Sequence, residues 1–239
     1  MKNTCSAMKN LTVSEIKVEL SEFLIPDLCI MCRRNVVDAG EAVCADCAKR
    51  LAYEQRRICI RCGAASRLCQ CGKPKKAETV KSVFWYRGIA KKYILYMKRN
   101  RIERQYGYAA SRMSALISED KELSSCDTIA YIPRSSRRAK ALGVDHSYEL
   151  AKRISENTGI PLGHFIVAPK KLREQKSLSA RERLRNVRNA YSASDKKPPE
   201  RVLLIDDVFT TGATAGECVR VLVKGGAKKV YCVFLGKTR

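Results

Sequence analysis

The sequence predicts an α/β domain with a mostly parallel sheet and flanking helices, preceded by a small cysteine-rich module. Two observations carry this prediction. From Val80 onward, short apolar segments typical of strands alternate with segments of helical character. Ahead of them, eight of the twelve cysteines lie between Cys29 and Cys71. With 239 residues, the chain is long enough for one full domain and a small appendage.

The expected strands and helices follow one another along the second part of the chain. Residues 202–205 form a continuous apolar run, which is typical of a strand buried on both faces of a parallel sheet. Gly159 supplies a natural C-cap for the helix before it. In full, we expect strands at 83–86, 127–132, 165–168, 202–205 and 230–235, and helices at 90–99, 104–118, 145–158, 179–188 and 215–224.

Changes in composition divide the chain into three parts. Residues 1–28 are a leader with apolar residues at helical spacing, residues 29–72 are the cysteine module, and residues 80–239 are the α/β domain. Between the last two, the segment 73–81 is polar and charged, as in a linker. The sequence has no run of about 18 apolar residues and no signal peptide. We therefore expect no membrane span and a cytoplasmic location.

The formal net charge of +23 indicates an anionic partner, because so large an excess repels itself in a compact protein. Candidate anions are nucleic acid, phosphorylated metabolites and anionic lipid. The segment 87–104 interleaves basic residues with tyrosines, a mixture that suits single-stranded nucleic acid, where bases stack on aromatic rings. A helix with buried tyrosines and a solvated basic face has the same pattern, so both interpretations stay open.

Four closely spaced pairs of cysteines form the cysteine module, and the first three pairs begin at a constant interval of 15 residues. Two thiolates separated by two residues can bind one ion, and two such pairs complete a tetrahedral zinc site. Such a closed site is structural, because it leaves no position for water. We therefore expect two structural zinc ions. Their predicted ligands are Cys29, Cys32, Cys44, Cys47, Cys59, Cys62, Cys69 and Cys71.

The way in which these pairs combine stays open. We favour a sequential arrangement, in which the first pair joins the second and the third joins the fourth. A cross-braced arrangement uses the same eight residues. Cys69 and Cys71 have only one residue between them, which departs from the usual knuckle. Disulfides are the alternative to metal, but the cytoplasm keeps thiols reduced, and the paired spacing suits zinc better than an iron–sulfur cluster.

Residues 203–215 predict a pocket for the phosphate and ribose of a phosphoribosyl compound. Asp206 and Asp207 are expected at the carboxyl end of a strand, where open α/β sheets bind ligands. The positive end of the following helix suits an anion. Between them, small residues permit a tight turn that exposes amides and hydroxyl groups to phosphate oxygens. These residues are Thr210, Thr211, Gly212, Ala213 and Thr214.

Two carboxylates beside a phosphate would repel it, so their presence needs an explanation. They can accept hydrogen bonds from vicinal ribose hydroxyls, and they can help to orient Mg2+ bound to pyrophosphate. An N-capping loop after a strand would explain the threonines, but it would not explain the acidic pair as well. The segment lacks the lysine of a Walker A loop, so an ATPase loop is excluded.

This segment resembles the phosphoribosyl pyrophosphate signature of type I phosphoribosyltransferases. Almost the whole chain resembles the ComF family of bacterial competence proteins, in which a double zinc ribbon precedes such a domain. Two further stretches resemble that family. They are 84–98, through Phe84, Tyr86, Gly88 and Lys98, and 175–187, through Gln175, Leu178, Ser179, Glu182, Arg183, Asn186 and Val187.

The resemblance implies a type I phosphoribosyltransferase-like sheet and a role in taking up single-stranded DNA during transformation, with a competence helicase as a further partner. One region departs from the family. Relatives carry an arginine–glycine–aromatic–asparagine–glutamine run where this chain has residues 142–146, of which only the glycine, Gly143, is kept. Contacts inferred from that run do not carry over. The preceding loop still offers Arg134 and Ser135 to a pyrophosphate.

Two functions follow from these features. We favour a ComF-like protein of DNA uptake that binds phosphoribosyl pyrophosphate with Mg2+, or a related ribose phosphate, and has single-stranded DNA as its partner. The alternative is an active phosphoribosyltransferase of nucleotide metabolism with an unknown acceptor. No catalytic general base is evident. The two histidines, His146 and His164, are expected to be structural.

We expect the purified protein to contain about two zinc ions per chain, because eight thiolates complete two closed tetrahedral sites. Elemental analysis after gel filtration measures this number. Replacing Cys44 with serine should lower it by about one ion, since one site then lacks a ligand. A folded protein free of zinc would contradict the assignment.

Overall fold

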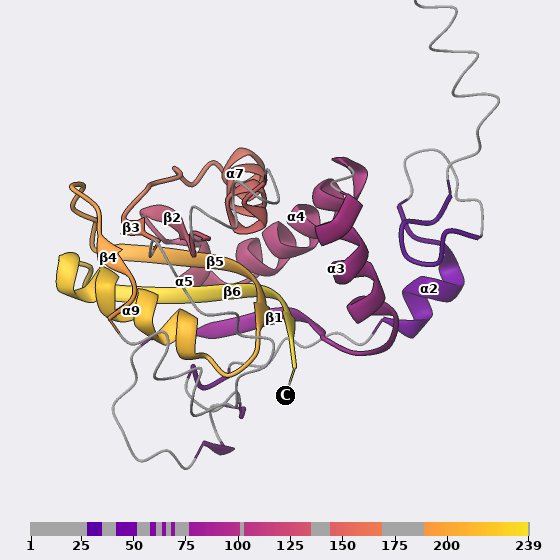
Figure 1. The fold of residues 1–239 in the computed structure, drawn as a ribbon, viewed down its shortest axis with the longest axis horizontal. Coiled ribbons are helices and arrows are strands. Elements are labelled where there is room, and N and C mark those ends of the chain that lie inside the picture. The colour runs from indigo at the N-terminus through magenta and orange to yellow at the C-terminus, as the bar shows by residue number, and fades with distance from the viewer. Residues whose placement is uncertain are drawn as a thin grey trace, which may run out of the picture.

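The computed structural model describes residues 28–34, 42–51, 58–60, 64–65, 68–69, 77–100, 103–134, 144–168 and 189–238. Its strands are β1 (Val80–Trp85), β2 (Thr128–Tyr131), β3 (Ile166–Val167), β4 (Ser192–Ala193), β5 (Arg201–Phe209) and β6 (Lys229–Lys237). Its helices are α2 (Ala45–Arg50), α3 (Gly88–Asn100), α4 (Glu103–Ser118), α5 (Lys121–Ser124), α7 (His146–Thr158) and α9 (Ala213–Gly225). Helices lie on both sides of the central sheet (Figure 1).

The central sheet has the strand order β1-β6-β5-β2, and each neighbouring pair in it is parallel. The predicted α/β class with a mostly parallel sheet is therefore confirmed. A separate antiparallel pair joins β3 to β4. The strand β4 was not expected, because its two exposed residues carry no apolar alternation. Among the described helices, none is long and apolar enough to cross a membrane.

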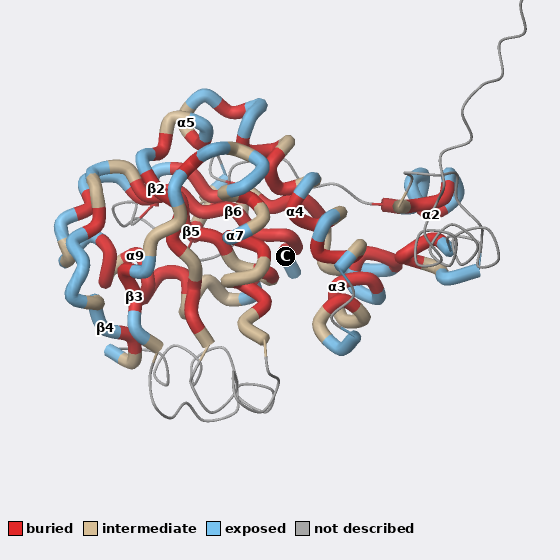
Figure 2. The backbone as a smooth tube through the Cα atoms, turned by 90° about the horizontal axis from the view of Figure 1, so that it is seen from above, coloured by how far each residue is buried: buried red, intermediate tan, exposed pale blue. Residues whose placement is uncertain are grey.

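Alternate residues of β5 pack into two hydrophobic cores, one on each face of the sheet. Leu203 and Ile205 belong to the core that includes α3, α4 and α7. Val202 and Leu204 belong to the core that includes α9. All four are fully buried, as the period of two along a strand covered on both faces requires. Figure 2 shows this continuous buried interior below exposed helix surfaces.

The predicted helix at 145–158 is confirmed, since α7 begins one residue later than expected, at His146, and ends at Thr158 as expected. Asp145 caps its beginning by accepting hydrogen bonds from the backbone amides of Ser147 and Tyr148. Gly159 ends it in the left-handed conformation, at φ 72°, as predicted. These two caps fix the two ends of α7, and Ser147 in its first turn contacts Asp206 of β5.

Two predicted boundaries near the expected pocket are wrong. The strand predicted at 202–205 extends to Phe209, because its parallel pairing with β6 continues as far as Lys237. Asp206 and Asp207 therefore lie within β5 and not beyond its end. The helix predicted at 215–224 begins at Ala213, since Gly212 serves as its N-cap. The predicted helix at 179–188 and the leader before Leu28 lie outside the described residues.

The cysteine module forms two lobes at different places on the domain (Figure 1). The first lobe, residues 28–34 and 42–51, lies beside α3. There the guanidinium of Arg33 lies 4.5 Å from the centre of the Tyr96 ring, and Arg104 donates a hydrogen bond to the Leu28 carbonyl at 3.2 Å. The second lobe, of which the structure describes residues 58–60, 64–65 and 68–69, attaches to the start of β1. The Ile58 amide donates to the Val80 carbonyl at 2.8 Å.

Candidate functional site

Four sulfur atoms gather in the first lobe. The Sγ atoms of Cys29, Cys32, Cys44 and Cys47 lie within 4.8 Å of one another, and those of Cys32 and Cys44 are 4.0 Å apart. Four thiolates at about 2.3 Å from a tetrahedral zinc ion are separated by roughly 3.8 Å, so the set fits structural zinc. The first cysteine pair thus meets the second, as in the sequential arrangement. None of the described cysteines is in a disulfide.

In the absence of metal, the closeness of these four thiols makes it costly for them to lose their protons. Burial, followed by hydrogen bonds from the neighbouring cysteines, raises the pKa of the Cys47 thiol. A divalent cation reverses this preference, because it stabilises thiolates directly. In the second lobe the structure describes Cys59 and Cys69, whereas Cys62 and Cys71 lie outside the described residues.

The acidic pair lies in β5 and contacts side chains from α3 and α7. Asp207 is buried, and its Oδ2 atom accepts from two cations, the Nζ of Lys98 at 2.8 Å and the Nη2 of Arg134 at 3.2 Å. Asp206 is partly buried and accepts a hydrogen bond from the Ser147 hydroxyl at 2.6 Å. Each carboxylate therefore has its own partners, drawn from α3, from α7 and from the segment after β2.

These partners give the two carboxylates different proton affinities. Burial and the charge of Asp207 raise the pKa of Asp206 to about 7. Burial would also raise the pKa of Asp207, but the charges of Lys98 and Arg134 outweigh it and lower that pKa below its usual value. Near neutral pH, Asp207 is ionised while Asp206 exchanges its proton. The pair can thus accept hydrogen bonds from sugar hydroxyls, and Asp206 can also donate one.

The loop between β5 and α9 carries the predicted phosphate-binding residues. Gly212 is the N-cap of α9 and lies at φ 70°, a conformation that favours glycine. Because it has no side chain, it donates or accepts no side-chain hydrogen bond at the first turn of α9. The Ala213 amide has a long hydrogen bond of 3.4 Å to the Thr211 hydroxyl. Thr210 is exposed, while Thr211 and Thr214 are partly buried. The 13-residue helix α9 therefore begins directly after this loop, a few residues after the acidic pair in the chain, and its positive end is available to an anion.

Three contributors to this site were not predicted as such. Asp145 accepts from the Arg134 amide at 2.9 Å and so fixes the segment that carries Arg134. Ser147 holds Asp206, and Lys98 holds Asp207. Lys98 was noted through the family resemblance and as part of the basic segment 87–104, but not as a partner of the acidic pair. An aspartate two residues before a serine at a helix start is an N-cap signal, and it could have drawn attention to Asp145. Ser135 lies outside the described residues.

The two histidines have the structural contacts expected of them. His146 is buried, and its Nδ1 atom is hydrogen-bonded to the Tyr106 hydroxyl. His146 also lies close enough to contribute to the lowered pKa of Asp207. His164 is exposed and lies 3.1 Å from the Tyr131 hydroxyl. Cys126, Cys218 and Cys232 are buried, and burial raises the pKa of each thiol, as suits packed small hydrophobes.

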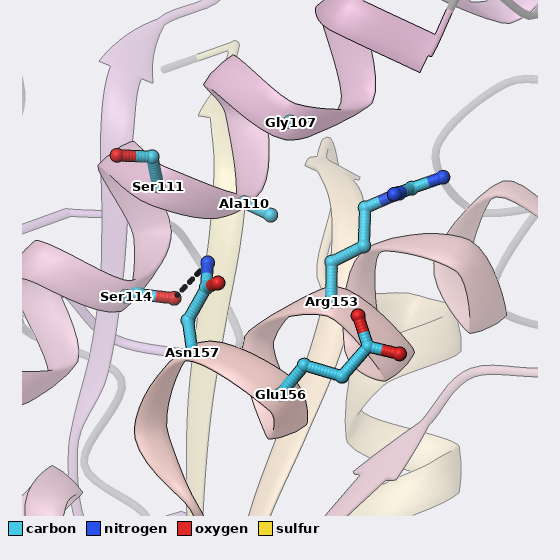
Figure 3. A pocket seen from close by; sticks show the side chains of 7 residues that line it. All are labelled: Gly107, Ala110, Ser111, Ser114, Arg153, Glu156 and Asn157. Atoms are coloured by element: carbon cyan, nitrogen blue, oxygen red, sulfur yellow. Dashed lines mark hydrogen bonds between the residues drawn. The ribbon is translucent and has the colours of Figure 1, made fainter. Parts of the chain in front are cut away.

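A groove of about 440 Å³ lies elsewhere, between α4 and α7 (Figure 3). Its two sides are joined by a hydrogen bond of 3.3 Å from the Asn157 amide to the Ser114 hydroxyl. Arg153, at its rim, pairs with Glu103. None of the predicted site residues lines this groove. Concavity alone therefore does not identify the functional site, and the acidic pair with its loop carries the recognisable chemistry.

We expect Asp206→Asn and Asp207→Asn to change stability in opposite directions at pH 8. A carboxyl whose native pKa is raised destabilises the fold progressively as pH rises from its unfolded pKa to its native pKa, so Asp206→Asn should stabilise by roughly 1–3 kcal/mol at pH 8 and change little at pH 3.5. Asp207→Asn leaves Lys98 and Arg134 without their carboxylate and should destabilise by roughly 1–3 kcal/mol. Denaturant unfolding at both pH values measures this. Equal destabilisation by both variants would contradict the assignment.

Comparisons with known proteins agree with this organisation. A sequence profile for the double zinc ribbon domain matches residues 20–80. The chain is 28% identical over 225 residues to the DNA utilization protein YhgH of Salmonella typhimurium, across 87% of this chain and 97% of that protein. It is 29% identical over 216 residues to Competence protein F of Haemophilus influenzae, across 84% and 93% of the two chains.

Two solved structures also align with the chain. The orotate phosphoribosyltransferase from Aeropyrum pernix aligns with 65% of this chain and 68% of its own, at 17% identity and a TM-score of 0.36. The purine phosphoribosyltransferase from Pyrococcus horikoshii aligns with 55% of this chain and 83% of its own, at 16% identity and a TM-score of 0.35.

The likeness to these proteins extends along most of the chain. The double zinc ribbon match precedes a parallel α/β sheet, and that sheet carries the acidic pair and leads into the glycine turn. The curated relatives align over nearly their whole length. The chain is therefore similar to a competence protein and to DNA utilization proteins, and it combines a double zinc ribbon match with a parallel α/β domain.

Proposed function

We propose that this protein acts in the uptake or use of DNA and holds phosphoribosyl pyrophosphate, or a related ribose phosphate, between β5 and α9. One observation carries the proposal. An acidic pair with unequal proton affinities, of which Asp207 is buried, comes shortly before a glycine turn that begins a helix. The names of the curated relatives, a competence protein and a DNA utilization protein, support the cellular role.

Different residues are proposed to bind different groups of the ligand. The loop Thr210–Thr214 offers backbone amides and hydroxyl groups to the 5′-phosphate at the positive end of α9. Asp206 and Asp207 accept hydrogen bonds from the ribose hydroxyls, and Lys98 keeps Asp207 ionised. In this proposal Arg134 pairs with the pyrophosphate. Mg2+ bound to the pyrophosphate would neutralise its charge and favour an ionised Asp206.

We expect phosphoribosyl pyrophosphate to bind the wild type in the presence of Mg2+, and Asp206→Ala/Asp207→Ala to weaken binding at least tenfold, because the ribose hydroxyls lose their acceptors. Isothermal titration calorimetry measures both. The matched control is Glu119→Ala/Asp195→Ala, which removes two acidic residues outside the site. Absence of binding to the wild type would remove the proposal.

We propose single-stranded DNA as the partner and a basic ridge as its contact. The ridge consists of exposed basic residues of the first lobe, of α3 and of the residue before α3; the helices α2 and α3 are neighbours in Figure 1. Tyr96 lies within it, beneath the guanidinium of Arg33. Cations beside an aromatic ring suit phosphates and stacked bases. The residues of the basic ridge are Arg33, Arg34, Lys49, Arg50, Arg87, Lys91, Lys92 and Arg99.

We expect affinity for single-stranded DNA to fall steeply with salt, because each neutralised phosphate releases counterions. Lys91→Glu/Lys92→Glu should weaken binding by about tenfold or more and flatten the salt slope by about one to two units. The matched control is Lys228→Glu/Lys229→Glu, which changes two adjacent exposed lysines at the opposite end of the sheet. Fluorescence anisotropy over a salt series measures both. Equal losses in the two variants would argue against the basic ridge.

The alternative, an active phosphoribosyltransferase, is favoured by one observation. A carboxyl group with a pKa of about 7 suits proton transfer near neutral pH, and Asp206 is such a group. Positioning and electrostatics would supply the rest of the catalysis. Release of pyrophosphate from phosphoribosyl pyrophosphate, assayed with candidate acceptors, separates turnover from binding alone.

A further inference from the structure

We propose that the second lobe of the cysteine module is part of the ligand site, because its segment Ile58–Ile60 positions the loop between β5 and α9. The identity of the ligand depends on the proposed function, whereas the contact between this segment and the loop does not. Two parts of the chain that are far apart in sequence meet here. One is the segment Ile58–Ile60 around Cys59, and the other is the glycine turn that begins α9.

The closest contact joins the Ile60 carbonyl to Gly212. A Cβ atom added to Gly212 would lie 1.8 Å from that carbonyl oxygen and 2.9 Å from its carbon. Gly88 and Gly159 also have positive φ, at 52° and 72°, yet a Cβ atom on either would meet nothing within 4 Å. Gly212 therefore satisfies two constraints. Its conformation favours glycine, and the backbone of the second lobe leaves no room for a side chain.

Apolar packing holds the same segment in place. Ile58 and Ile60 are 3% and 4% exposed, and they belong to the core that contains Phe209, Ala215 and Phe234. The Phe209 ring lies 2.9 Å from the Cβ position of Gly212. The glycine turn is thus held between the Ile60 carbonyl on one side and the last residue of β5 on the other. Loss of Ile60 would free one side of the turn.

Backbone hydrogen bonds fix the segment to both modules. The Ile58 amide donates to Val80 at the start of β1, and the Cys59 amide donates to Ala64 within the second lobe, each at 2.8 Å. Ile58 also forms an antiparallel bridge with Ala65. Cys59, a predicted zinc ligand, lies between the two isoleucines. A metal bound there would order both neighbours and, through them, the turn at Gly212.

The first lobe offers a matched comparison within the same chain. Ile30 follows Cys29 as Ile60 follows Cys59, and it is buried to a similar extent, at 5% exposed. It packs in the other core, on the side of α3 and α4. The two knuckles are therefore alike in sequence, but only the second contacts the phosphate loop among the residues that the structure describes.

This contact gives the second lobe a role in binding. A loop that offers amides to a phosphate binds more tightly when it is already ordered, because less freedom is lost on binding. Thr210–Thr214 contains small residues and a glycine, which leaves it little order of its own. The carbonyl and side chain of Ile60 supply that order from outside the domain. Ile60 is thus a positioning residue and not a catalytic one.

The test compares Ile60→Ala with Ile30→Ala in the full-length protein. Hydrogen exchange of the ligand-free protein, followed by mass spectrometry, should be at least about tenfold faster at amides 210–214 in Ile60→Ala and unchanged there in Ile30→Ala. Calorimetry with phosphoribosyl pyrophosphate and Mg2+ should give an affinity about five- to tenfold weaker for Ile60→Ala only.

Equal exchange at 210–214 in the two variants overturns the inference. If the wild type binds no phosphoribosyl pyrophosphate, the proposed function fails, and the exchange comparison still decides this inference. Should Ile60→Ala not fold, Gly212→Ala and Gly159→Ala replace the pair, since both strain a positive φ but only the first meets the Ile60 carbonyl. Gly212→Ala should then accelerate exchange at amides 58–60, and Gly159→Ala should not. No acceleration at 58–60 in Gly212→Ala overturns the inference.

Discussion

The buried carboxylate of Asp207 joins three separate parts of the chain, and the arrangement of the site depends on it. Lys98 comes from α3, Arg134 from the segment after β2, and Asp207 itself from β5. Without the two cations, this carboxylate would be too costly to bury as a charge. With them it stays ionised, and burial together with the charge of Asp207 raises the pKa of Asp206 beside it. One ion-pair cluster thus fixes the position of Asp207 and contributes to the proton affinities of both carboxylates.

The two lobes of the cysteine module contact two different elements of the proposed site. Its first lobe packs beside α3, the helix that carries Lys98, and its second lobe contacts the turn at Gly212. Structural zinc sites order a small module that has too little core of its own. We propose that this order extends into the domain, where each lobe contacts one element of the proposed ligand site. The double zinc ribbon therefore has a place in the proposed binding mechanism, in addition to any contact with DNA.

Local sequence patterns predicted the parts of this account that depend on near neighbours. The parallel sheet follows from apolar runs, the end of α7 from Gly159, and the phosphate turn from Gly212. The sequence could not place Ser147 against Asp206, because the two residues are 59 positions apart and meet only when α7 packs on β5. The contact of Ile60 with Gly212 was also beyond reach. This contact is made by a backbone carbonyl, and because every residue has one, no residue type in the sequence indicates it.

The central claim is that the glycine turn and the acidic pair form one ribose phosphate site, supported by the second lobe. A crystal structure of the complex with phosphoribosyl pyrophosphate and Mg2+ tests it most directly. The account predicts the 5′-phosphate on the amides of Thr210–Thr214, the ribose hydroxyls on Asp206 and Asp207, and the Ile60 carbonyl still against Gly212. A ligand bound away from the acidic pair, or a second lobe displaced from the turn, would contradict it.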